Sequence, residues 1–160
     1  KKWGAIVGMP LEKGIALSAG MQLIKDEELD DINKDFEYKL KQLINNFNKF
    51  NAFYIHIKQT DAASHLGHFS LKYNIIEKLD NIIIGGIINQ IGLNKINTLV
   101  LTCDHRTSSV MKRHTNENIP VMIYNKKFGR SLPFGETNCK LNHVKEIKKA
   151  TDIIKFISKL

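Results

Sequence analysis

Aspartate and histidine occur together at two points in the chain, each time just after a short apolar run. The first pair is Asp61 and His65, and the second is Asp104 and His105. A further histidine, His114, follows ten residues after Asp104. Carboxylate oxygens and imidazole nitrogens are common ligands of divalent metal ions. The residue types therefore predict metal chemistry.

The spacing of these residues suggests how they can share ions. Asp61 and His65 are four residues apart, so both side chains lie on one face if a helix begins there. Asp104 and His105 are adjacent at the end of an expected strand, where they can point to different metals about 4 Å or more apart. His114 can complete a set of three with the first pair. An Asp-x-x-x-His spacing also occurs at solvated helix starts, so the residues alone leave a structural reading open.

The elements that must position these side chains follow from the hydrophobic pattern. Lysines fill the polar face of the first expected helix, and Gly85-Gly86 weakens or breaks the second. Strands that alternate with long helices indicate an α/β fold of three α/β/α layers with a mostly parallel sheet. We expect helices over residues 30–50, 71–91 and 141–160, and strands over 53–57, 98–102 and 121–124.

Ligands of such sheets gather at the carboxyl ends of the strands. Asp61 and Asp104 both follow an expected strand, so both are predicted to lie at this edge. Nucleic-acid binding gives no reason for that placement, which makes a basic polyanion-binding module the weakest of the candidate functions.

Composition narrows the class of protein. The 160 residues, 42% of them hydrophobic, suit one domain or most of one, and residues 1–160 are interpreted as a single portion of a metal-binding domain. The two cysteines lack Cys-x-x-Cys spacing, and neither a signal peptide nor a long apolar run is present, which favours a cytoplasmic location without a membrane span. The net charge of +8 suits a phosphorylated metabolite, whereas aromatic interleaving for nucleic acid is weak.

Several motifs, spread over most of the chain, resemble the archaeal-type cofactor-independent phosphoglycerate mutases of the alkaline phosphatase superfamily. Cofactor-independent here means independent of 2,3-bisphosphoglycerate. The motifs are His56 to Gly67, Ile75 to Asp80, Asp104 to Thr107 with Lys112 to Thr115, Ile119 to Tyr124, Lys13 to Ile15 with Ala19 to Met21, and Phe134 to Cys139.

The resemblance implies a phosphoryl transfer with two divalent metals that interconverts 3-phosphoglycerate and 2-phosphoglycerate in glycolysis through a phosphoserine. By this resemblance Asp61, His65 and His114 hold one metal, while Asp104 and His105 belong to the other. Mn²⁺ is the expected metal, and Zn²⁺, Co²⁺ or Mg²⁺ also fit mixed Asp/His ligation. The resemblance also makes Lys58 a candidate for stabilising phosphate charge.

Departures from the family pattern limit this interpretation. No segment resembles the region of the nucleophilic serine, and the inserted substrate domain is largely missing. The chain is therefore expected to be the C-terminal part of a mutase, inactive alone and partnered by the missing N-terminal half. Leu17 stands where arginine is expected, and Arg106 where a small residue or proline is usual. A related metal-dependent phosphatase or phosphotransferase remains the alternative.

Overall fold

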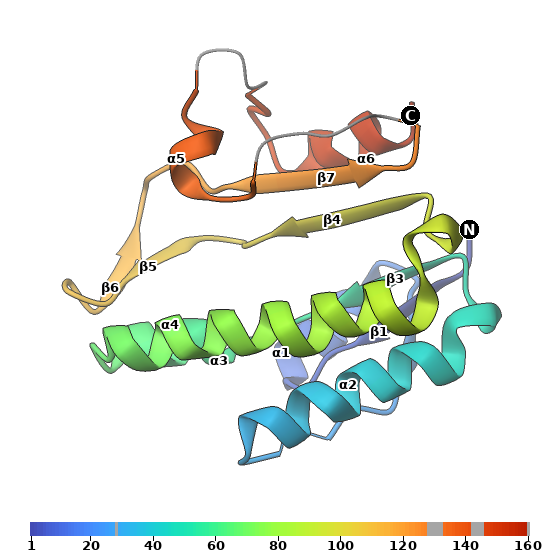
Figure 1. The fold of residues 1–160 in the computed structure, drawn as a ribbon, viewed down its shortest axis with the longest axis horizontal. Coiled ribbons are helices and arrows are strands. Elements are labelled where there is room, and N and C mark those ends of the chain that lie inside the picture. The colour runs from blue at the N-terminus through green and yellow to red at the C-terminus, as the bar shows by residue number, and fades with distance from the viewer. Residues whose placement is uncertain (28, 128–132, 142–145, 160) are drawn as a thin grey trace. The chain divides into compact units, whose positions relative to one another are not determined.

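The computed structural model describes residues 1–27, 29–127, 133–141 and 146–159 (Figure 1). The chain divides into two compact units. Unit 1 comprises Lys1–Ile91 and Ser108–Arg113, and unit 2 comprises Gly92–Thr107 and His114–Leu160.

The elements alternate between strands and helices through residue 102. The first part of the chain forms β1 (Trp3–Ile6), α1 (Pro10–Ser18), β2 (Gln22–Ile24), α2 (Ile32–Asn46) with a 3₁₀ turn at Phe47–Lys49, β3 (Ala52–Ile55), α3 (Gln59–His65), α4 (Phe69–Lys78), and π-helical segments at Leu79–Ile84 and Ile87–Ile91. The rest forms a 3₁₀ turn at Leu93–Lys95, β4 (Thr98–Thr102), β5 (Arg106–Ser108), β6 (Arg113–Thr115), β7 (Val121–Asn125), α5 (Glu136–Cys139) and α6 (Thr151–Ile157).

A parallel sheet of three strands organises unit 1. Its order is β2-β1-β3, and central Ala5 lies opposite Leu23 on one side and Tyr54 on the other. Ala5, Ile6 and the following Val7 are buried, because β1 is covered on both edges and by helices. The predicted mixed α/β fold with a parallel sheet is confirmed.

Unit 2 contains an antiparallel pair. β4 and β7 run in opposite directions, with Thr98 opposite Asn125, whose Nδ2 donates a hydrogen bond of 2.9 Å to Thr98 Oγ1. Parallel strands usually need a helical crossover. Between β4 and β7 the chain forms only the β5–β6 hairpin, so β7 returns alongside β4 in the opposite direction.

Helix α2 confirms the amphipathic helix expected over residues 30–50. Asp31 caps it by accepting a hydrogen bond of 3.0 Å from the Lys34 backbone N–H, and this contact holds the pKa of the Asp31 carboxyl below its usual value. Phe36 and Leu40 are buried on its inner side. The expectation that its lysines face outward is wrong at Lys39, which is 2% exposed.

The second long helix continues without interruption from α4 to Ile91 (Figure 1). Gly85 and Gly86 do not break it, and π-helical turns lie on either side of them. The reason for glycine at position 86 is close packing against α2. A Cβ built on Gly86 would lie 2.2 Å from Leu40 Cδ2.

We expect Gly86→Ala to lower the free energy of unfolding by about 1–3 kcal/mol, because Leu40 must leave its buried position. Gly85→Ala is the matched control, since its new Cβ meets nothing closer than the Asp80 carbonyl oxygen at 3.5 Å. That variant should gain roughly 0.5–1 kcal/mol from helix propensity. Urea denaturation of both variants measures the difference, and equal stabilities would show that α2 does not require glycine at position 86.

The last expected helix is shorter than predicted. It begins at Thr151 rather than near residue 141, and residues 142–145 lie outside the described residues. Residues 146–150 are not helical. Among them only Ile147 and Ala150 are apolar, too few for an amphipathic face that tertiary packing could stabilise.

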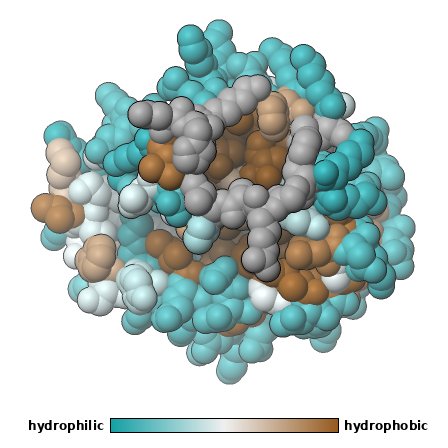
Figure 2. Space-filling model, turned by 45° about the horizontal axis from the view of Figure 1, so that its top comes forward, coloured by the Kyte–Doolittle hydropathy of each residue, from teal (hydrophilic) through white to brown (hydrophobic). Residues whose placement is uncertain are grey.

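Hydrophilic and hydrophobic residues share the surface. Figure 2 shows one face of the molecule, on which hydrophilic residues surround separate groups of hydrophobic ones. Within the described part of the chain, no helix is both long enough and apolar enough to cross a membrane.

Candidate metal centre

The first Asp/His pair lies on α3, which begins four residues after β3 ends. Asp61 is in the first turn and His65 is the last residue of the helix. Their spacing of four brings Asp61 Oδ1 within 3.4 Å of His65 Nε2, and their side chains are 27% and 44% exposed. The predicted helix and the shared face are confirmed, and neither side chain is fully buried.

The other ring nitrogen of His65 is fixed by the backbone. His65 Nδ1 lies 3.1 Å from the carbonyl oxygen of Lys112, which belongs to the same unit. A carbonyl can only accept, so Nδ1 carries the proton, and in the neutral ring Nε2 is the bare nitrogen. This nitrogen faces the Asp61 carboxylate, and a cation is what two such electron-rich atoms can share. A backbone partner of this kind is typical of metal-ligating histidine.

The second ligand group belongs to unit 2. Asp104 and His105 follow β4, as predicted, and Asp104 Oδ2 lies 3.3 Å from His105 Nε2. The other Asp104 oxygen accepts a hydrogen bond of 2.9 Å from the His105 backbone N–H. His105 Nδ1 lies 3.1 Å from Thr107 Oγ1, which orients the ring. The Asp104 carboxylate is 74% exposed and open to solvent.

His114 stacks on His105. The two ring centroids are 3.7 Å apart with an angle of 28° between the rings. His105 precedes β5, and His114 lies within β6, so pairing of these two strands brings the rings together.

Arg106 supports this hairpin, although the resemblance favoured a small residue at its position. Its guanidinium lies 3.0 Å from Glu117 and 2.7 Å from Glu136 at the start of α5. Both carboxylates are largely exposed, so the ion pairs contribute little stability by themselves. They do link α5 to the segment that carries His105.

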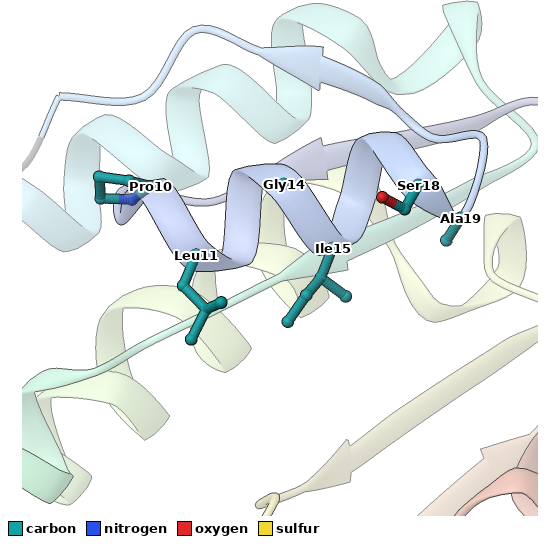
Figure 3. A pocket seen from close by; sticks show the side chains of 6 residues that line it. All are labelled: Pro10, Leu11, Gly14, Ile15, Ser18 and Ala19. Carbon is teal, nitrogen blue, oxygen red and sulfur yellow. The ribbon is translucent and has the colours of Figure 1, made fainter.

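Lys58 and the glycine-containing segment are the remaining features that the resemblance indicated. Lys58 is exposed at the N-cap position of α3, three residues before Asp61. Lys13 to Ile15 of the glycine-containing segment lie in α1, which ends at Ser18, and Gly20 follows the helix with a φ of 76°. One side of α1 carries a shallow apolar pocket, where Leu11 and Ile15 project (Figure 3). None of the predicted metal ligands lines this pocket.

The donor set as a whole fits a divalent transition metal. Two carboxylates and three imidazoles offer hard oxygens and borderline nitrogens, which suit Mn²⁺, Zn²⁺ or Co²⁺. Unit 1 holds Asp61 with His65, and unit 2 holds Asp104, His105 and His114. Within unit 1 the structure joins Asp61 to His65, and within unit 2 it joins His105 to Asp104 and His114. The predicted set of Asp61, His65 and His114 is thus divided between the two units, and ligation by all five residues stays a prediction. Sequence reasoning missed the Lys112 carbonyl, because a backbone contact leaves no residue signature.

A known protein family matches most of the chain. A model of the metalloenzyme superfamily matches residues 26–157. The chain belongs to this superfamily. The chain is also 32% identical over 137 residues to a protein of Thermosipho melanesiensis described as a probable 2,3-bisphosphoglycerate-independent phosphoglycerate mutase. It is 31% identical over 124 residues to the 2,3-bisphosphoglycerate-independent phosphoglycerate mutase of Pyrobaculum islandicum. These relatives confirm the resemblance predicted from the motifs.

The chain spans about a third of the length of these relatives. The alignments cover 84% and 77% of this chain but only 31% and 29% of the two relatives. The solved structure of the PH0037 protein from Pyrococcus horikoshii matches 99% of this chain and 48% of its own, with a TM-score of 0.78 and 22% identity. That match shows the fold, which is consistent with part of an alkaline-phosphatase-like core.

Proposed function

We propose that this chain is the C-terminal part of a metal-dependent phosphoglycerate mutase that interconverts 3-phosphoglycerate and 2-phosphoglycerate. The observation that carries the proposal is the Asp61–His65 pair, whose histidine donates Nδ1–H to a backbone carbonyl and turns Nε2 toward the carboxylate. The names of the aligned relatives favour a mutase over a related phosphatase.

In this proposal Asp61 and His65 hold one divalent ion together with His114. Asp104 and His105 hold part of a second site. Mn²⁺ is the preferred ion, with Zn²⁺, Co²⁺ or Mg²⁺ as substitutes. When bound, two such ions neutralise phosphate charge and polarise the oxygens of the transferred group.

The remaining groups of the reaction have different sources. Lys58 is exposed near the first pair and is proposed to stabilise phosphate charge. The serine that carries the phosphoryl group, and the substrate domain, are proposed to come from the remainder of the mutase, which acts as partner of these 160 residues. We therefore expect the isolated residues to be inactive and the complete enzyme to work in the cytoplasm.

A chimera tests the proposed function. The aligned segment of the Thermosipho melanesiensis protein is replaced by the corresponding residues of this chain, and ³¹P spectra follow 3-phosphoglycerate in the presence of Mn²⁺. We expect 2-phosphoglycerate to form without release of inorganic phosphate, and Asp61→Ala to abolish the conversion. Release of phosphate would instead identify a phosphatase. A folded chimera that does neither, beside an active parent, would contradict the proposal.

A further inference from the structure

Helix α3 has little intrinsic stability. It has only seven residues, far fewer than an isolated helix needs in water. No side chain caps its N-terminus, because the N-cap residue is Lys58. Asp61 nevertheless sits in its first turn, where an uncapped helix frays most easily. Contacts outside the helix must therefore fix the geometry of the Asp61–His65 pair.

Gln59, the first residue of α3, makes such a contact with α2. Its Nε2 donates a hydrogen bond of 2.9 Å to Asp35 Oδ2, and the Asp35 side chain is fully buried. The residues are 24 apart in sequence, so this bond ties α3 to another element. Oε1 of Gln59 is buried and accepts no hydrogen bond from any described residue. Burial of this oxygen without a hydrogen-bond donor costs free energy, and the hydrogen bond from Nε2 to Asp35 offsets that cost.

Asp35 is itself held by a buried charge cluster, made of Asp26, Asp35 and Lys39. Lys39 Nζ lies 3.2 Å from Asp35 Oδ1 and 2.7 Å from Asp26 Oδ2. The backbone N–H of Leu29 also donates to Asp35 Oδ1, at 3.2 Å. With Oδ1 shared by these two donors, Oδ2 faces Gln59 as an ionised acceptor, which makes the bond charge-assisted and strong.

We propose that Gln59 is a positioning residue for the metal site, which acts by anchoring the first turn of α3 to Asp35 and so holding Asp61 in register with His65. The proposal rests on the proposed metal-binding function of that pair. A carboxylate and an imidazole chelate one ion well only when both are held in place beforehand. Loss of the anchor should therefore lower the affinity of α3 for the metal ion more than it lowers the stability of the fold.

The test replaces Gln59 by leucine, which keeps the size of the side chain and removes the donor. Calorimetry with Mn²⁺ measures affinity, and hydrogen exchange measures the opening of α3. We expect Gln59→Leu to weaken Mn²⁺ binding about tenfold, a loss typical of residues that orient metal ligands. Amides of α3 should exchange faster in the metal-free variant, while those of β1 should keep their wild-type rates.

Two control variants separate positioning from general stability. Ile24→Val removes a methylene from the buried side of β2, so it should lower the melting temperature and leave Mn²⁺ affinity unchanged. Gln90→Leu makes the same chemical change at an exposed residue and should alter neither quantity. Mn²⁺ affinity of Gln59→Leu within twofold of wild type would overturn the proposal.

The outcomes also distinguish this inference from the proposed function. If the wild-type chain binds no Mn²⁺, the proposed function fails, and exchange in α3 still decides whether Gln59 anchors the helix. Wild-type exchange rates in Gln59→Leu would overturn the anchor whatever the metal result.

Discussion

Lys39→Met is expected to lower the free energy of unfolding by about 3–5 kcal/mol, the usual cost of removing one partner from a buried ion pair. Lys39 is 2% exposed, and its ammonium contacts the buried carboxylates of Asp26 and Asp35. Without the lysine, two negative charges remain in the interior of unit 1 with no counter-ion in the cluster. Equilibrium urea denaturation, with circular dichroism as the signal, measures the loss.

Two further variants identify the cause. Lys41→Met makes the same substitution at an exposed site on α2 and should change stability by less than about 0.5 kcal/mol. Combining Lys39→Met with Asp26→Asn and Asp35→Asn removes all three charges and should recover part of the loss. A decrease below about 1 kcal/mol for Lys39→Met alone would mean that water reaches the cluster and screens it.

Asp61→Ala should weaken binding of Mn²⁺ to the chain by about 100-fold or more, equivalent to about 2.7 kcal/mol. The substitution removes the only carboxylate of α3, whose Oδ1 lies beside His65 Nε2, and leaves the imidazole without a charged partner ligand there. Alanine also favours helix, so α3 itself should persist. Calorimetric titration of wild type and variant at one pH measures the effect.

Asp30→Ala is the matched control, because it removes an equally charged but exposed carboxylate outside the predicted ligand set. It lowers the negative charge of the chain by the same amount. Its Mn²⁺ affinity should stay within about twofold of wild type, since surface charge acts weakly in salt. Equal losses in both variants would mean that Mn²⁺ responds to general electrostatics rather than to a built site.

Much of the local structure could be predicted because the spacing of hydrophobic residues along the chain indicates helices and strands directly. The strand expected over residues 98–102 matches β4, and the helix over residues 30–50 matches α2. Other features depend on tertiary contacts, which the spacing of hydrophobic residues does not reveal. Gly86 looked like a weak point in a helix, yet it is where Leu40 packs closely. Lys39 looked like a solvated lysine, and only the fold shows the two carboxylates that surround it.

The candidate site was predictable in its residue types and partly in its geometry. The spacing of Asp61 and His65 predicted that they share one helix face. The apolar run before Asp104 predicted that this residue follows a strand. The stacking of His114 on His105 depends on strand pairing in a short hairpin, which periodicity does not reveal. The Gln59 anchor depends on Asp35, which lies on another helix.

The most direct test of the account is the number of tight Mn²⁺ equivalents bound by wild type, His114→Ala and Asp104→Ala in calorimetric titrations. His114 is the proposed third ligand of the ion held by Asp61 and His65, whereas Asp104 belongs to the incomplete second set. The account predicts one tight equivalent in wild type, its loss in His114→Ala, and its retention in Asp104→Ala. No tight equivalent in wild type, or an unchanged one in His114→Ala, would contradict the account.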